Sequence, residues 1–582
     1  MKSTALRAML TCCLAASAVS CASNGSATDP TTASSAAITV AETTVATAAE
    51  PTTTELPTTA ASADAEPTGS SADADADADA GRNGFSVGIG EPPAIDPGLA
   101  QDVDGAQVTR LMFVPLVRLD PELNVVPGVA SEWSVAEDGL TWTFELDPDA
   151  TYSDGRPVVA DDFVHAFARL ADPDFEAVSA YQGLPIAGWA DVNGAEPSGE
   201  IGDVEVAGVT AVDDSTLTIS TEAPFGLLPK VLTYVAFAPI PRDFVADDDA
   251  AATFADYPVG NGPYMMGAPW DHGNSISLVR NPNFAGEPGI ADTITFQIYT
   301  DSQLQFAAFE AGDLDIARGL TSNALATVQN KYADRFVSTA TGTLTYIGFP
   351  TNIAPYDNPD IRRALSLAIN RDTIATGAFA STQRAATGMV PSQVPGALQE
   401  TCDACTFDPV LAKQLWDAAG GLPGNTMVVY DIADDGTGGL DPILTSWRET
   451  FGIEIEVRSF EFGEYLDETA PGKPVGPFEL GWSWDYPSGY SFLSPLFEST
   501  SDINNLLWSN SEFDALLKSA RTAPTEVAGL TFLTEAQSIV EAEMPMAPIL
   551  FANDLGVYSE RLSNVLVDAT GIWRLELVEV AD

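Results

Sequence analysis

The chain has 582 residues, enough to bury a large core, and 83 acidic against 25 basic residues give a formal net charge of −58. This balance argues against binding to a nucleic-acid backbone or an anionic membrane surface, because both need clustered Lys and Arg. Only two histidines are present, so a His-rich metal site or a His-driven hydrolase has little material. We expect no cofactor, no metal and no nucleic-acid partner. A hydrophobic fraction of 45% indicates that most of the chain is globular.

Residues 1–21 have the pattern of a secretory signal peptide. Lys2 and Arg7 precede an apolar run over 8–19, and small residues lead to Cys21. The run is too short to be a permanent membrane span. A Cys at the cut site also resembles a bacterial lipobox, so we expect export and a diacylglycerol anchor on Cys21. The alternative is a plain signal peptide with an incidental Cys.

Residues 22–84 are predicted to be a disordered linker. The segment is rich in Thr, Ala, Ser, Pro and Asp, carries a net charge of −9, and shows no apolar period of 3.6 or 2. Nothing in it repays the entropy of ordering, and self-repelling charge keeps such a chain extended. We expect a tether, with an interaction tail as the alternative. Residues 85–582 carry the remaining net charge of −51. Such an acidic surface aids solubility or favours cationic ligands.

The body of the chain mixes strand and helix patterns, which favours an α/β fold. Alternation with period 2 predicts strands, and an apolar stripe at helical spacing predicts helices. The strands are expected at 141–146, 215–220 and 452–457, and the helices at 160–170, at 360–373 and in a segment ending near Phe451.

Cys402 and Cys405 form a CxxC pair. Such a pair can be redox-active, half of a metal site or a structural disulfide. No second CxxC and no nearby His completes a zinc tetrad, and an exported protein is oxidised. We therefore expect a small local disulfide, whereas Cys12 and Cys13 leave with the signal peptide.

Several short segments follow one another along the body in a specific order and spacing: 95–97, 114–117, 127–133, 140–146, 152–158, 161–164, 258–264, 280–284, 309–315 and 358–364. Together they resemble the extracellular solute-binding family that serves oligopeptide and dipeptide import by ABC transporters. The resemblance covers nearly all of residues 85–582.

This resemblance implies a two-lobed, periplasmic-binding-protein-like α/β fold of the large peptide-binding class (type II). Lobe I would span 85–300, lobe II 301–550, and residues 551–582 would return to lobe I. Two crossing strands would form the hinge, and ligand would bind in the cleft between the lobes, which close around it. We expect a monomer that works with a permease and ATPase complex at the outer face of the cytoplasmic membrane or in the periplasm.

The stretch 478–487 matches the family's ligand-binding segment. In peptide-binding members the Asp at the position of Asp485 pairs with the ligand's α-amino group, which a buried ammonium requires. The resemblance likewise implies that Gly481 and Ser483 offer backbone groups to an extended peptide. Three aromatic residues would wall the side-chain pockets: Trp482, Trp484 and Tyr486. The alternative is an ordinary buried strand followed by a turn.

On the opposite lobe, the loop containing Asp102 and Asp104 falls where the family brings a loop to the cleft, and Tyr181 is also expected to reach it. Peptide binders often place a basic residue just before the Gly-Trp pair to receive the ligand's carboxylate. This chain has Glu479 nearby instead, so the contact for the carboxyl end stays unassigned.

The sequence therefore predicts a non-enzymatic peptide receptor of an ABC importer. The same fold with another solute, such as an oligosaccharide, a nickel complex or an opine, is the nearest alternative. Two other classes are an extracytoplasmic hydrolase with paired carboxylates and an adhesion or sensory domain. The chain shows no His-Glu-x-x-His motif, which disfavours a metal-dependent hydrolase.

Overall fold

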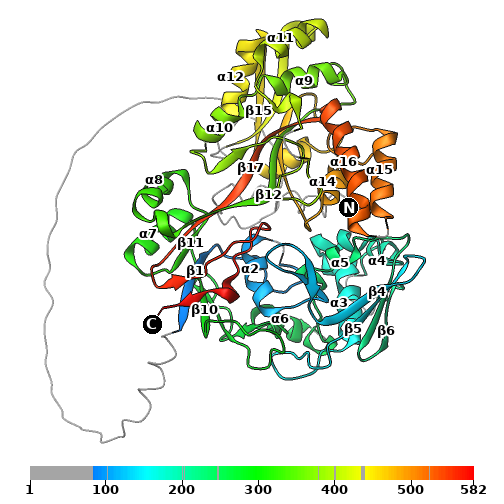
Figure 1. The fold of residues 1–582 in the computed structure, drawn as a ribbon, viewed down its shortest axis with the longest axis vertical. Coiled ribbons are helices and arrows are strands. Elements are labelled where there is room, and N and C mark those ends of the chain that lie inside the picture. Colours follow the sequence, from blue (N-terminus) through cyan, green and yellow to red (C-terminus); the bar gives the residue numbers. More distant parts are fainter. Residues whose placement is uncertain are drawn as a thin grey trace, which may run out of the picture. The chain divides into compact units, whose positions relative to one another are not determined.

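A computed structural model describes residues 83–581, apart from 101, 199–200, 202–203, 246–247, 378, 399–400, 434–439, 502 and 524. The expected signal peptide, Cys21 and nearly all of the linker lie outside these residues. Figure 1 shows the order of the elements along the chain.

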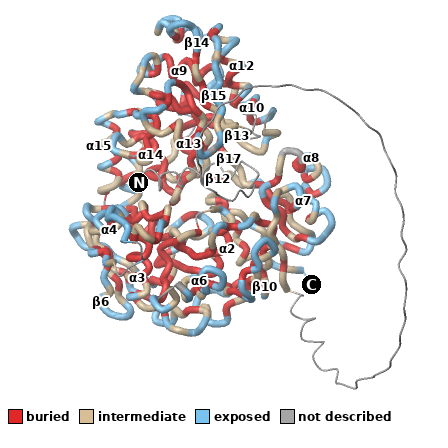
Figure 2. Tube along the Cα trace, turned by 180° about the vertical axis from the view of Figure 1, so that it is seen from behind, coloured by how far each residue is buried: buried red, intermediate tan, exposed pale blue. Residues whose placement is uncertain are grey.

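One large mixed sheet runs through the described body and carries both lobes. Its strands follow the order β15-β14-β16-β12-β17-β11-β1-β10-β9-β8, with β13 on β17. Their bounds are β15 Glu454–Phe460, β14 Thr426–Ile432, β16 Phe478–Ser483, β12 Phe336–Gly348, β17 Met546–Tyr558, β11 Ile316–Arg318, β1 Gly84–Ile89, β10 Thr293–Ile298, β9 Ser275–Arg280, β8 Tyr264–Met266 and β13 Gln383–Ala385. Buried residues concentrate on this sheet and on the helix faces packed against it (Figure 2).

The long strands β12 and β17 connect the two lobes. Each has 13 residues, and they run antiparallel side by side (Figure 1). Residues 336–340 pair with 553–557, beside β11 and β1, whereas residues 343–348 pair with β16. The register between β12 and β17 shifts between Ala340 and Leu344. This irregularity marks the place where the ladder passes from one lobe to the other.

The strand pairings favour a first lobe boundary near residue 342 rather than the expected 300. Strand β11 pairs with β1 in parallel and with β17, so residues 302–335 belong to the lobe I side. Helices α7 (Ser302–Ala311) and α8 (Ser322–Lys331) form a small second core there with β11 and the end of β17. The chain returns to lobe I through residues 551–553 of β17, close to the expected position.

Lobe I also contains a four-stranded antiparallel sheet in the order β4-β5-β7-β6. The prediction of a strand at 141–146 is confirmed by β5 (Thr141–Leu146), and that at 215–220 by β7 (Thr216–Ser220). The other two strands are β4 (Ala130–Val135) and β6 (Val209–Asp213). Helix α3 (Ala160–Ala171), predicted at 160–170, packs against β6 and β7.

The remaining elements of lobe I are short. Two further pairs of strands are present, β2 (Val117–Leu119) with β3 (Val125–Pro127) and β18 (Leu562–Ser563) with β19 (Glu579–Val580). The helices are α2 (Val103–Met112), η1 (Pro173–Phe175), η2 (Val178–Gly183), α4 (Trp189–Asn193), α5 (Leu228–Val231), η3 (Val235–Phe237), η4 (Arg242–Val245), α6 (Asp248–Asp256), η5 (Ala333–Arg335) and η8 (Leu575–Leu577).

Two of the family-like segments have clear structural roles in lobe I. Asp96 accepts hydrogen bonds from Arg169 at 2.6 and 3.2 Å in a buried ion pair, and the Arg169 guanidinium lies 3.7 Å from the centre of the Phe175 ring. The turn at 258–264 packs on the end of α2, where a Cβ on Gly260 would lie 2.0 Å from the Met112 carbonyl oxygen. Only glycine fits that approach.

Lobe II surrounds its part of the sheet with helices. They are α9 (Pro359–Leu367), α10 (Arg371–Gly377), η6 (Asp403–Cys405), α11 (Pro409–Ala418), η7 (Pro423–Asn425), α12 (Leu440–Phe451), α13 (Phe462–Glu468), α14 (Tyr490–Phe497), α15 (Ser511–Arg521) and α16 (Glu526–Glu543). The predicted helix end at Phe451 is confirmed by α12. The predicted strand at 452–457 is β15, which begins two residues later.

The prediction of one helix over 360–373 is wrong, because the structure has two helices, α9 and α10. The Arg371 guanidinium donates to the carbonyl oxygens of Ser366 and Ile369. The side chain of Asn370 accepts from the Thr373 N–H at 3.1 Å, at the start of α10. These side chains satisfy backbone groups at the break, as caps do at helix ends.

Candidate functional site

The candidate site begins at the end of β16 and continues into the turn before α14. Strand β16 pairs with β12, with Thr345 opposite Gly481 and Thr343 opposite Ser483. The hydroxyl groups of Thr343 and Ser483 are 2.7 Å apart. The site is therefore attached directly to a strand that connects the lobes.

Asp485 lies in this turn and contacts the opposite lobe. Its carboxyl lies close to the hydroxyl groups of Ser491 and Tyr181, and Tyr181 belongs to η2 of lobe I. The Asp485 N–H donates to Ser491 Oγ at 2.9 Å. Burial raises the pKa of the Asp485 carboxyl to about 6, although both hydroxyl groups act to lower it. An ionised carboxylate has no cationic partner among these contacts, which would favour a cationic group beside it.

The three aromatic residues of the stretch are mostly buried, but their surroundings differ. Trp482 donates from Nε1 to the Ser491 carbonyl oxygen at 2.9 Å, so its polar atom is satisfied within lobe II. The Trp484 ring covers Gly342, because a Cβ added to this glycine would lie 2.4 Å from the ring. The backbone N–H of Trp484 donates to the Gly342 carbonyl oxygen. Tyr486 lies near Asp485 and Glu526; burial is the main cause of its raised pKa, and both charges add to it.

The edge of β16 that faces away from β12 has little strand pairing within the described residues. Strand β14 meets β16 at the pair Tyr430–Phe478 alone, and Tyr465 donates its hydroxyl hydrogen to the Glu479 carbonyl oxygen at 2.5 Å. Over Leu480–Ser483 the described part of the chain supplies no second strand. Backbone groups of such an edge are where an extended peptide can add as a strand.

Asp102 and Asp104 are engaged in a different network. Asp102 caps α2 by accepting from the N–H groups of Asp104 and Gly105 at 3.0 and 2.8 Å. Asp104 accepts from the Gly90 N–H at 2.8 Å and pairs with Arg318 at 3.0 Å. These contacts lie within lobe I and favour a structural role for both residues. The structure brings Tyr181 to Asp485, but it places Asp102 and Asp104 at the start of α2.

A second contact between the lobes lies beside this site. Lys230 in α5 donates from Nζ to Glu526 Oε1 in the first turn of α16 at 2.6 Å, and its side chain is only 6% exposed. Neither Lys230 nor Glu526 was predicted from the sequence. A signal existed, because Lys230 is the one charged residue within the apolar run 224–241.

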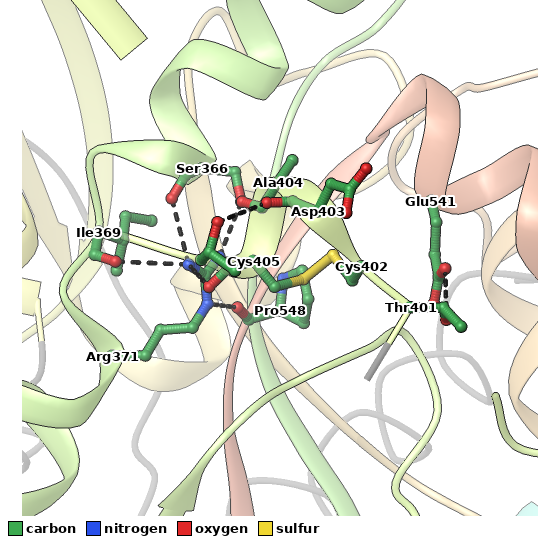
Figure 3. Close-up of a disulfide and its surroundings, with 11 residues drawn as sticks. Ser366, Ile369, Arg371, Thr401, Cys402, Asp403, Ala404, Cys405, Glu541 and Pro548 are labelled. Atoms are coloured by element: carbon green, nitrogen blue, oxygen red, sulfur yellow. Dashed lines mark hydrogen bonds between the residues drawn. A yellow bond between two sulfur atoms is a disulfide. The ribbon is translucent and has the colours of Figure 1, made fainter. Parts of the chain in front are cut away.

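Cys402 and Cys405 are joined by a disulfide in η6. Figure 3 shows Arg371 pointing at this loop, and its guanidinium donates to the Cys405 carbonyl oxygen at 2.8 Å and to that of Pro548 in β17. Ser366 donates to the Ala404 carbonyl oxygen at 2.7 Å. Both sulfurs belong to buried residues. The disulfide therefore fixes a loop that supplies one of the carbonyl groups around the buried Arg371.

Other kinds of site find little support in the described chain. No group of three or more His, Cys, Asp or Glu side chains there is arranged to hold a metal ion. No helix of that same part has both the length and the apolarity to cross a bilayer. Surface hollows of about 480 Å³ over α11 and α12, and about 70 Å³ beside the 258–264 turn, do not contain Asp485.

Residues 124–504 match the family model of bacterial extracellular solute-binding proteins, family 5. The chain belongs to this family. Among curated relatives, the oligopeptide-binding protein OppA of Bacillus subtilis (strain 168) is 28% identical over 499 residues, 83% of this chain and 89% of that protein. The dipeptide-binding protein DppE of the same organism is 25% identical over 503 residues, with the same coverage of 83% and 89%.

Solved structures share the fold. The unliganded open form of the periplasmic murein tripeptide binding protein MppA has a TM-score of 0.75 at 23% identity and covers 86% of this chain and 98% of its own. Haemophilus influenzae OppA in complex with RPPGFSPFR has a TM-score of 0.68 at 23% identity, with 86% and 99% covered. The expected two-lobed, periplasmic-binding-protein-like α/β architecture is confirmed.

Proposed function

We propose that this solute-binding protein captures peptides outside the cytoplasmic membrane and delivers them to an ABC permease. Asp485 binds the ligand's α-amino group, and the edge of β16 at Gly481 and Ser483 binds its backbone. The observation that carries the proposal is the Asp485 carboxyl, which is partly shielded from water and lies close to the Tyr181 hydroxyl group of the opposite lobe. A peptide ammonium supplies the missing positive charge and strengthens contact between the lobes.

Lobe closure follows from the two connecting strands. Strands β12 and β17 change partners over a few residues near Gly342, so a small rotation there moves one lobe against the other. A ligand that contacts both lobes stabilises the closed arrangement by its differential affinity for it. Tyr181 and Tyr486 border the same carboxyl and complete the ligand's surroundings, whereas Trp482 and Trp484 wall the site from within lobe II.

The protein's location and partners belong to the same proposal. Export by the segment 1–21 and a lipid anchor on Cys21 hold the receptor at the membrane, and residues 22–84 give it reach. The receptor acts as a monomer and catalyses no reaction. The chain's similarity to peptide-binding relatives supports this assignment.

Calorimetry with peptides tests the proposal. A peptide with a free α-amino group should bind, and its N-acetylated form should bind at least tenfold more weakly. The substitution Asp485→Asn should weaken the binding of the peptide with a free α-amino group by about 2–5 kcal/mol, as expected when a buried charge partner is lost. Equal affinities for both peptides, or an unchanged affinity of the variant, would refute the role of Asp485.

Mass spectrometry of the ligand that co-purifies with the protein distinguishes peptides from a sugar, a nickel complex or an opine. A non-peptide solute in stoichiometric amount would leave the receptor fold intact and overturn its ligand class.

A further inference from the structure

The buried ammonium of Lys230 is held by a carboxylate of the opposite lobe. Lys230 lies in α5, whose other residues are buried in the core of lobe I. Its Nζ is 2.6 Å from Glu526 Oε1, which belongs to lobe II. A buried ammonium is stable only with a charged or strongly polar partner. Any motion that separates the lobes removes that partner, so Lys230 needs an anion again when the lobes close.

Glu526 depends much less on this pair than Lys230 does. Its side chain is 28% exposed, against 6% for Lys230. It is the first residue of α16, after the N-cap Thr525, where the helix N-terminus stabilises negative charge. Glu526 can therefore turn to water at little cost. If a second carboxylate takes the place of Glu526 beside Lys230, Lys230 keeps an anionic partner and water solvates Glu526.

Asp485 lies in the turn just before α14, and Glu526 begins α16, which packs against α14. The negative charges of both carboxylates help to raise the pKa of Tyr486. Each carboxylate faces a polar group of lobe I, Tyr181 for Asp485 and Lys230 for Glu526. The interface thus presents a carboxylate and an ammonium on the same side of lobe II, which is the pattern that complements a molecule with an amino and a carboxylate end.

We propose that Lys230 binds the carboxylate end of the ligand, and that Glu526 occupies this place in the ligand-free protein. The inference rests on the proposed function, which assigns the amino end to Asp485. It supplies the contact for the ligand's carboxyl end, which the sequence left unassigned. A ligand with a free carboxylate displaces Glu526 from Lys230. A ligand without one leaves Lys230 paired with Glu526 and binds more weakly.

Titration of the intrinsic tryptophan fluorescence with three tripeptide mixtures tests this inference. The mixtures have both ends free, the carboxyl end amidated, or the amino end acetylated. On the wild-type protein, amidation should weaken binding at least tenfold. Lys230→Met should weaken the binding of the mixture with both ends free at least tenfold. It should also abolish the difference in affinity between this mixture and the amidated one. Lys413→Met is the matched control, because Lys413 pairs with Asp417 at 2.6 Å on the exposed face of α11, and it should change neither affinity.

Glu526→Gln distinguishes a ligand contact from a simple latch between the lobes. If Glu526 competes with the ligand's carboxylate, the variant should bind free-ended peptides several-fold more tightly, with little change for amides. If the pair merely holds the lobes together, Glu526→Gln and Lys230→Met should both weaken free and amidated peptides alike, which would overturn the inference. Thermal melting of each variant confirms that it is folded before titration.

The outcomes also separate this inference from the proposed function. Loss of binding on acetylation without any effect of amidation would overturn the role of Lys230 alone. Binding that is indifferent to acetylation but sensitive to amidation and to Lys230→Met would retain Lys230 and overturn Asp485. Failure of the free-ended mixture to bind the wild-type protein would overturn both.

Discussion

Replacing Asp485 with Asn should stabilise the ligand-free protein while it impairs binding. Burial raises the pKa of this carboxyl from 3.8 to about 6. At pH 7.5 the carboxyl is ionised, and its poor hydration destabilises the folded protein. The shift corresponds to about 3 kcal/mol, at about 1.4 kcal/mol per pKa unit. Asn has nearly the same volume and keeps a side-chain oxygen close to the hydroxyl groups of Tyr181 and Ser491. The free energy of unfolding of the variant should therefore exceed that of the wild type by nearly this amount at pH 7.5.

The pH dependence of this gain gives the sharper test. Above pH 6 the folded wild type carries the charged form, and the full difference between variant and wild type is present. As the pH falls from 6 to about 4, Asp485 takes up a proton in the folded state first, and the difference fades. Below about pH 4 the group is protonated in both the folded and unfolded states, so the two proteins should have equal stability.

Denaturant unfolding of both proteins between pH 4 and 8 measures this difference directly. Other carboxyls with raised pKa values, such as those of Asp162 and Asp554, titrate in both proteins and cancel in the comparison. A variant that is no more stable than the wild type at pH 7.5, or a gain that does not change with pH, would refute the reasoning.

Three further predictions concern binding, packing and the disulfide. Affinity for a free-amino peptide should fall about tenfold per pH unit below pH 6, because the ammonium needs the ionised carboxyl; calorimetry at pH 5 and 7 checks this, and equal affinities would contradict it. Gly260→Ala should cost more than about 2 kcal/mol of unfolding free energy through its clash with Met112, whereas Gly463→Ala, with open space around it, should not destabilise the protein. Replacing Cys402 and Cys405 by Ser should cost about 2 kcal/mol by loop-closure entropy, measured by urea unfolding; an unchanged midpoint would show that the loop stays ordered without the bond.

Local patterns predicted the elements whose residues determine their own conformation. Alternation gave β5 at 141–146, and helical spacing with acidic residues in the first turn gave α3. The helix expected over 360–373 failed because its break depends on Arg371. That guanidinium is held by carbonyl groups from 366, 369, 405 and 548. A pattern within fourteen residues cannot contain partners that lie so far along the chain.

The candidate site divides in the same way. The stretch 478–487 and its aspartate could be recognised from the sequence, because strand, turn and charge are contiguous there. The assignment of Asp102 and Asp104 rested on a loop position, and the structure engages them at the start of α2. Lys230 could be noticed as a charge in an apolar run, but its partner lies 296 residues away, and no local signal connects the two.

The sequence by itself determined the acidic character of the chain, the segment types and the presence of an aspartate directly after an aromatic strand. These depend on composition and on neighbours within a few residues. Only the tertiary structure decided that Tyr181 meets Asp485 and that Lys230 meets Glu526. Both contacts arise where two lobes approach across β12 and β17, and the strength of a charge there depends on how much water the opposite lobe removes.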